Sequence, residues 1–139
     1  MQEGTSQAPG YPEETAGREP DVFAAQCPTR QLLDRVADKW SVLILAALGE
    51  EDMRFNALKR KVSGISQKML SQTLRALERD GLVQRSVFPT IPVSVSYAIT
   101  PLGCELLDAL RSMIDWAQSR LPQVVSAQRD FDARMAGMG

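Results

Sequence analysis

The 139-residue sequence contains no histidine and only two cysteines, and no apolar run approaches the roughly 20 residues that cross a bilayer. Cys27 and Cys104 stand far apart, without the CxxC spacing of zinc sites. Histidine is the commonest general base, and neither a glycine-rich phosphate loop nor a carboxylate cluster beside a nucleophile replaces it. We therefore expect no metal, no cofactor and no enzymatic activity.

The sequence also lacks an N-terminal basic segment followed by an apolar stretch, so no secretory signal is expected and the protein is predicted to be cytoplasmic. Its content of 44% hydrophobic and 24% charged residues suits one globular domain. Residues 1–26 are rich in Gly, Pro, Glu, Thr and Ser and have a net charge of −4. Without apolar periodicity, this segment is predicted to be a flexible acidic tail.

Charge is unevenly distributed along the chain. The total is −1, yet residues 54–85 carry eight basic and two acidic side chains, a net charge of +6. A basic block of this kind is typical of a surface that meets phosphate groups.

The apolar spacing predicts a series of helices. Leu32, Leu33 and Val36 indicate a first helix that starts near Thr29, and a second, apolar almost all round, runs from residue 39 until Gly49 closes it. A short third helix covers residues 54–62. A fourth begins at Ser66, whose hydroxyl suits an N-cap, and stops at Gly81.

Beyond the fourth helix the apolar period shortens to two. Residues 82–88 and 93–99 alternate and flank "PTIP", which predicts a β-hairpin. Thr100 and Pro101 then start a helix that runs to Leu121, where Pro122 is expected to interrupt it before a last short helix.

Helix, tight turn, helix and hairpin form the winged variant of the helix-turn-helix. We predict a mainly α (α+β) fold with a two-stranded β-hairpin wing and terminal dimerisation helices. The DNA-binding domain is expected over residues 27–121, and residues 122–139 are expected to add a C-terminal helix to dimerisation.

The fourth helix is predicted to read double-stranded DNA. Leu70, Leu74 and Leu77, with Met69, are expected to anchor it to the core. The outward positions hold residue types that pair with base edges or phosphates: Gln67, Lys68, Ser71, Gln72 and Arg75. Ser66 marks a helix start rich in backbone donors, and Lys59, Arg60 and Lys61 are expected to grip phosphates. The alternative for such a face is simple solvation.

Several motifs in order resemble the HxlR-type (MarR-like) winged-helix regulators of bacteria: "CP" at 27–28, "KWSVLIL" at 39–45, "RF..L" from 54, "GIS.K.LSQTLRALERDGLV.R" at 64–85 and "P.SVSYAITPLG" at 92–103. The resemblance implies a homodimer, formed through the terminal helices, on an inverted repeat. The family usually has glycines where this chain has Ala37 and Asp38, and an arginine where it has Ser94. Arg85 is then the nearest basic candidate in the wing.

These observations predict a homodimeric transcriptional regulator, in most cases a repressor, on promoter DNA. The alternative is a protein-interaction module that keeps the winged-helix shape without binding DNA, which Ser94 and the acidic pI favour.

The dimer contact is expected on the helix from Pro101 to Leu121, helped by the segment around Phe131 and by the first helix. Its apolar residues cover too wide an arc for one small domain to bury: Leu106, Leu107, Leu110, Met113, Ile114 and Trp116. The alternative is an ordinary core helix.

Cys27 is a candidate thiol sensor. The resemblance implies that this cysteine responds to quinones, aldehydes or oxidants in some family members, so a small electrophile is a candidate effector. A helix N-terminus and Arg30, one turn on, favour the reactive thiolate. The alternative is that Cys27 is a small buried apolar residue, and Cys104 is expected to be structural.

Overall fold

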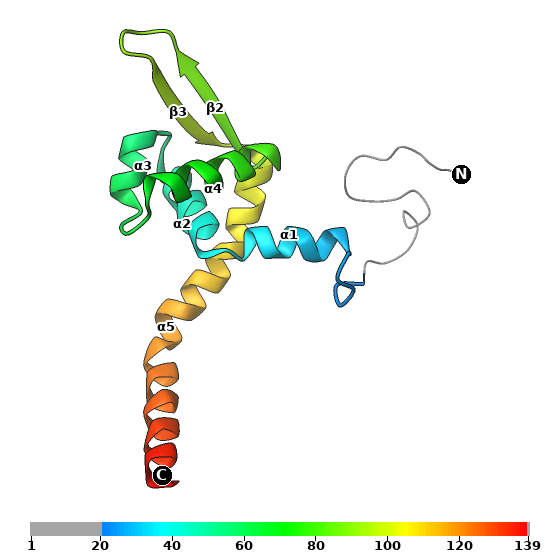
Figure 1. The fold of residues 1–139 in the computed structure, drawn as a ribbon, viewed down its shortest axis with the longest axis vertical. Coiled ribbons are helices and arrows are strands. Elements are labelled where there is room, and N and C mark those ends of the chain that lie inside the picture. Colours follow the sequence, from blue (N-terminus) through cyan, green and yellow to red (C-terminus); the bar gives the residue numbers. More distant parts are fainter. Residues whose placement is uncertain (1–20, 139) are drawn as a thin grey trace, which may run out of the picture.

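The computed structural model in Figure 1 describes residues 21–138. The expectation for residues 1–20 lies outside this range, and residues 21–26 form hydrogen-bonded turns in which Ala24 N donates to Asp21 O and Cys27 N donates to Ala24 O. The elements are α1 (Pro28–Val36), α2 (Lys39–Glu50), β1 (Met53–Arg54), α3 (Phe55–Lys61), α4 (Gln67–Arg79), β2 (Val83–Phe88), β3 (Ser94–Ile99) and α5 (Pro101–Met138). Their order confirms the predicted mainly helical winged helix-turn-helix.

Helix α2 occupies the centre of the hydrophobic core. Its side chains Ile44, Leu45 and Leu48 are fully buried, as the apolar sequence on all its faces predicts. They pack in one cluster with Leu58 of α3 and with the apolar face of α4. Helix α1, in contrast, buries none of its residues, so it lies on the surface of the domain rather than in its core.

The sheet has three strands where the sequence predicted only the two-stranded hairpin. The strand order is β1-β3-β2, with Met53 opposite Tyr97 in one antiparallel pair and Val83 opposite Ile99 in the other. Strand β1 has two residues, which is too short to show a period of two. It ties the returning wing strand to the segment that enters α3.

The turns around α4 agree with the prediction. Ser66 caps the helix, and its Oγ accepts a hydrogen bond from Met69 N at 3.1 Å. Gly64 and Gly81 have φ angles of 91° and 78°, in the region that favours glycine. These two glycines fix the entry to α4 and the exit toward the wing.

Gly49 does not end α2 as predicted, because the helix continues through it to Glu50. A Cβ atom at Gly49 would collide with Leu107 Cδ2 of α5. The glycine therefore permits the close approach of α2 and α5 and does not act as a helix terminator.

Thr100 joins three elements at the base of the wing. Its Oγ1 accepts a hydrogen bond from Gly103 N at 3.0 Å, the cap expected at the start of α5. The same oxygen donates to Gly81 O at 2.7 Å, and Thr100 N donates to Leu82 O at 3.1 Å. One residue thus fastens α5 to the turn that leaves α4.

Helix α5 is continuous from Pro101 to Met138, so the predicted break at Pro122 is wrong and the expected boundary at residue 121 falls inside one helix. An interior proline removes one hydrogen bond and bends a helix without having to end it. The helix changes direction part-way along, and its distal part extends away from the other elements (Figure 1). Only Gly103, Leu107 and Leu110 of α5 are buried.

Candidate nucleic-acid interface

The outer face of α4 is polar and exposed. Leu70, Leu74 and Leu77 lie in the core and set the rotation of the helix. The side chains predicted to face outward are all exposed: Gln67, Lys68, Ser71, Gln72 and Arg75. Met69 is 38% exposed, so the prediction that it anchors the helix is wrong. Thr73 is buried on that side instead, and its Oγ1 donates to Met69 O at 2.8 Å.

Basic side chains of α3 lie beside the start of α4. Lys59, Arg60 and Lys61 are exposed in the last turn of α3. Lys59 and Arg60, together with Ser66 and the turn at Gly64, line a shallow hollow of about 570 Å³. The structure therefore brings these two basic side chains and the capping residue of α4 to one place. Lys61 points to another side, where its Nζ lies 3.1 Å from Glu50 Oε1.

Arg85 and Arg75 extend the basic surface from α4 to the wing. Arg85 is exposed on β2, opposite Tyr97 in the sheet, with its Nε 3.9 Å from Glu78 Oε1. Burial raises the pKa of the Tyr97 hydroxyl, while the positive charges of Arg85 and Arg75 act in the opposite direction. Both arginines are thus close enough to Tyr97 for their charges to be felt there.

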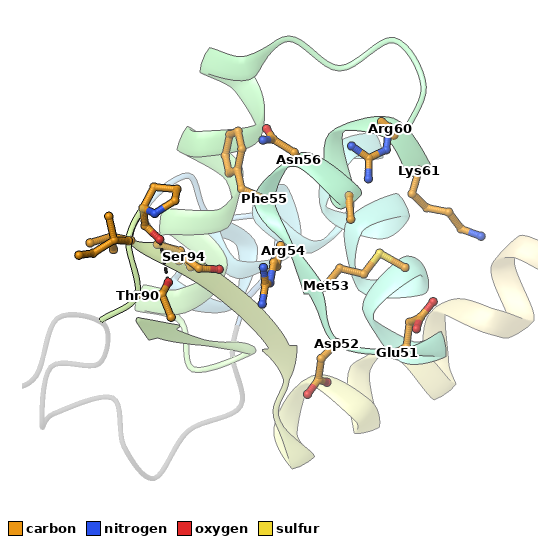
Figure 2. A pocket seen from close by; sticks show the side chains of 15 residues that line it. Glu51, Asp52, Met53, Arg54, Phe55, Asn56, Arg60, Lys61, Thr90 and Ser94 are labelled. Carbon is orange, nitrogen blue, oxygen red and sulfur yellow. Dashed lines mark hydrogen bonds between the residues drawn. The ribbon is translucent and has the colours of Figure 1, made fainter. Parts of the chain in front are cut away.

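A groove separates the wing tip from β1 and α3 (Figure 2). Its volume is about 1080 Å³, and its walls include Arg54 and Arg60 on one side and the wing segment from Thr90 to Val95 on the other. Glu51 and Asp52 lie along the same groove. Sequence reasoning missed Arg54 as a site residue, because the wing that faces it comes more than thirty residues later in the chain.

Helix α5 carries a stripe of apolar residues on its distal part. The spacing alternates between three and four residues, as in a coiled coil, with one polar member: Ile114, Ala117, Leu121, Val124, Gln128, Phe131, Met135 and Met138. Leu121, Phe131 and Met135 are exposed, and so is Trp116 at 60%. We call this stripe the seam of α5; Pro122 directly follows Leu121 and lies off it. Ile114 packs against the core, and from Ala117 onward the described residues leave the stripe uncovered.

The burial of Cys27 agrees with the alternative that it is a small buried apolar residue, whereas the exposure of Cys104 differs from the expectation. Cys27, the candidate sensor, is 8% exposed at the N-cap of α1, and Cys104, expected to be structural, is exposed on α5. The guanidinium of Arg30 donates to Phe23 O at 3.1 Å. Neither cysteine forms a disulfide.

Within residues 21–138, no group of three or more His, Cys, Asp or Glu side chains is placed to hold a metal ion. No helix in the described range has the length and apolar character that a membrane span requires.

Comparison with known proteins agrees with this geometry. Residues 35–125 match the family described as HxlR-like helix-turn-helix. The chain is 43% identical over 111 residues to the HTH-type transcriptional regulator YtfH of Escherichia coli, covering 80% of this chain and 88% of that protein.

Solved structures give the same relationship. A transcriptional regulator, ytfH, from Salmonella typhimurium superposes with a TM-score of 0.75 and 46% identity, over 81% of this chain and 99% of that one. Diamide-treated YodB from Bacillus subtilis superposes with a TM-score of 0.58 and 32% identity, over 69% of this chain and 96% of that one.

Proposed function

The chain belongs to the HxlR-like helix-turn-helix family of transcriptional regulators, and from that premise we propose that it binds an inverted repeat in promoter DNA as a homodimer. Members of this family are regulators and not enzymes. We place its action in the cytoplasm, where bacterial DNA lies. Repression follows if the bound dimer excludes RNA polymerase from the promoter.

The exposed polar face of α4 carries the proposal. Lys68, Gln72 and Arg75 project from a helix whose opposite side is locked into the core. None of the three has an ion pair or a side-chain hydrogen bond within the described residues. A recognition helix needs such free donors and acceptors, because base edges in the major groove must satisfy them.

Phosphate contacts are assigned to the surfaces on either side of α4. Lys59 and Arg60 lie beside the capped start of α4, where Ser66 and free backbone amides favour an anion, and Arg85 lies beyond its far end. Gln67 and Ser71 complete the proposed contact surface on α4 itself.

Fluorescence anisotropy with labelled duplexes tests this function. The duplexes come from the region upstream of the chain's own gene and from a shuffled control of the same composition. We expect tighter binding to one upstream segment and a steep loss of affinity with rising salt, because counterions are released from the phosphates. Equal affinity for the shuffled control, or no binding, would contradict the proposal.

The uncovered seam on α5 supports the homodimer. A heptad-like stripe of apolar side chains on an isolated helix is stable when a second helix covers it. Leu32 and Leu33 of α1 add further exposed apolar surface, beside a groove that also includes Leu102 and Leu106 of α5. A second copy of the chain matches these surfaces, since both partners present the same stripe.

The alternative function is a protein-interaction module that keeps the fold and has lost DNA binding. The wing favours it, since it carries apolar rather than basic residues at its tip. Reversing the charges with Lys68→Glu and Arg75→Glu separates the two functions. A DNA-binding regulator loses promoter control in cells, whereas an interaction module retains it with both substitutions in place.

We also propose that Cys27 senses thiol-reactive compounds such as quinones. It occupies the N-cap position of α1, and the similar YodB structure was obtained after treatment with diamide, a thiol oxidant. Because Cys27 is nearly covered, modification requires the start of α1 to move, and that movement would be passed to the dimer.

The two cysteines provide matched variants for a test of sensing. Diamide is expected to weaken DNA binding by the wild type and by Cys104→Ser, but not by Cys27→Ser. Equal sensitivity of Cys27→Ser and the wild type would remove Cys27 as the sensor.

A further inference from the structure

The outer part of the wing is uncharged. Residues 86–100 include no Asp, Glu, Lys or Arg, although the wing follows α4 and its basic neighbours directly in the chain. This outer part gains little from phosphate groups, so the electrostatic contact of the wing with DNA is confined to Arg85 near its base. The contribution of the outer part to binding must come from another kind of contact.

The tip of the wing exposes large apolar side chains. Ile91 is fully exposed, Val93 is 66% exposed and Phe88 is 44% exposed. Together with Pro92 they form what we call the tip cluster. Side chains of these types act as wedges between base steps in proteins that bend DNA through the minor groove. Apolar surface at the end of a projecting hairpin is costly in water, which indicates that a partner covers it.

The tip cluster is held in a fixed shape. Thr90 Oγ1 donates to Pro92 O at 2.7 Å, and Thr90 N donates to Phe88 O at 2.8 Å. These two bonds close the loop on either side of Ile91, whose side chain stays fully exposed. A wedge needs this property, because a floppy loop would lose entropy when it inserts.

The base of the wing is joined rigidly to α4. Leu82 N donates to Leu77 O at 2.9 Å, and Thr100 bonds to both Gly81 and Leu82. Strand β1 braces β3 from the other side. When α4 lies in a major groove, the wing is therefore carried toward the DNA next to it, where the neighbouring minor groove passes.

We propose that the tip cluster inserts into the minor groove beside the site read by α4, unstacks a base step there and bends the DNA. The inference rests on the proposed DNA-binding function. The wing then contributes through sequence-dependent deformability, so flexible pyrimidine–purine steps are preferred at the position of the tip. Continuity with the polar face of α4 favours DNA over a protein as the partner.

The test uses the full-length protein and an operator duplex labelled at both ends, so that energy transfer reports bending. A 2-aminopurine base at the expected tip position reports unstacking by its fluorescence. Ile91→Ser is expected to reduce both signals and to weaken affinity about tenfold per wing, since one large apolar side chain leaves its contact. Because Ile91 is fully exposed, folding is retained.

Two further variants control the experiment. Ile91→Leu keeps an apolar tip and should bend DNA as the wild type does. Lys59→Ala should reduce the dependence of affinity on salt but leave the bend unchanged, whereas Ile91→Ser should leave the salt dependence unchanged.

The outcomes separate this inference from the proposed function. If the wild type binds selectively and Ile91→Ser binds and bends DNA equally well, the wedge is wrong while DNA binding stands. The wedge is also wrong if Ile91→Ser alters transcription but leaves DNA binding and bending unchanged, because the tip would then contact a protein. If the wild type shows no selective binding, both the function and the wedge are wrong.

Discussion

Arg35 of α1 forms an ion pair with Asp80 at the end of α4, with Arg35 Nη1 2.6 Å from Asp80 Oδ2. The same nitrogen donates to Ala76 O at 3.3 Å. A cation at this position also neutralises the negative end of the α4 dipole. The contact connects the surface helix α1 directly to the helix that we propose reads DNA.

Removing this ion pair should cost more than removing an exposed one. Arg35→Met leaves the partly buried Asp80 carboxylate without its partner at a helix C-terminus, and we expect a loss of about 1–2 kcal/mol in the free energy of unfolding. Lys61→Ala breaks the exposed ion pair with Glu50 and should change the free energy of unfolding by less than about 0.5 kcal/mol. Urea denaturation measures both, and equal losses would show that the Arg35 contact is an ordinary surface pair.

Gly103 should not tolerate a side chain. A Cβ atom there would collide with Leu82 O and lie 2.7 Å from Ile99 Cγ1, so Gly103→Ala forces α5 away from the base of the wing. We expect a loss of about 2–3 kcal/mol, seen as a lower melting temperature. Gly137 in the same helix has open space around it, and Gly137→Ala should be neutral or slightly stabilising. Similar behaviour of the two variants would contradict the contact at Gly103.

Mutations of the residues proposed to contact base edges and of those proposed to contact phosphates should have different effects on DNA binding. Gln72→Ala and Arg75→Ala are expected to relax sequence preference, each at a cost of about 1–3 kcal/mol for the preferred site if the contact is bidentate. Lys59→Ala should weaken binding to all sequences alike and flatten the salt dependence. Binding to a panel of single-base operator variants at several salt concentrations measures both effects. Identical behaviour of the two classes would mean that α3 and α4 have been assigned the wrong roles.

The seam on α5 predicts how the oligomeric state responds to single substitutions. Phe131→Asp places a charge in the seam and should weaken the dimer by at least about tenfold, whereas Gln128→Leu replaces its polar member and should strengthen it. Gln123→Asp, off the seam, serves as the control and should leave the dimer unchanged. Sedimentation over a range of micromolar concentrations decides, and a wild type that stays monomeric throughout would rule out the dimer.

Stability at high pH should depend on Tyr97. Burial raises the pKa of its hydroxyl above the ordinary value of 10.0, so the folded protein retains a proton that the unfolded chain releases. The protonated Tyr97 hydroxyl therefore makes its full contribution to the free energy of unfolding below about pH 10. This free energy falls as the pH rises through the raised pKa. Tyr97→Phe should reduce this fall in denaturation measured at pH 9–11. An unchanged pH profile in the variant would show that Tyr97 is not responsible.

The helices and hairpin could be predicted because their signals are local. Ser66, Gly81 and Thr100 mark boundaries through hydrogen bonds and backbone angles that depend on a few neighbouring residues. The outward face of α4 followed from the spacing of its leucines alone.

What sequence reasoning missed depends on contacts between distant segments. Strand β1 exists because Met53 pairs with Tyr97, and two residues carry no periodic signal of their own. The prediction that Pro122 ends a helix hides the stripe, which continues from Leu121 to Val124 on either side of this proline. The exposure of Cys104, which was expected to be structural, likewise depends on tertiary packing that its position in the sequence does not encode.

The hydrogen bonds of Thr100 make the base of α5 a pivot. Measured along its bent axis the helix is about 57 Å long at 1.5 Å per residue, and it acts as a lever whose base is attached to the wing and to the exit of α4. A displacement of about 5 Å at its far end turns the base by only about 5°. A large displacement of the distal end therefore produces only a small displacement of the DNA-facing elements. A displacement of α5 near Thr100, in contrast, is transmitted to these elements almost undiminished.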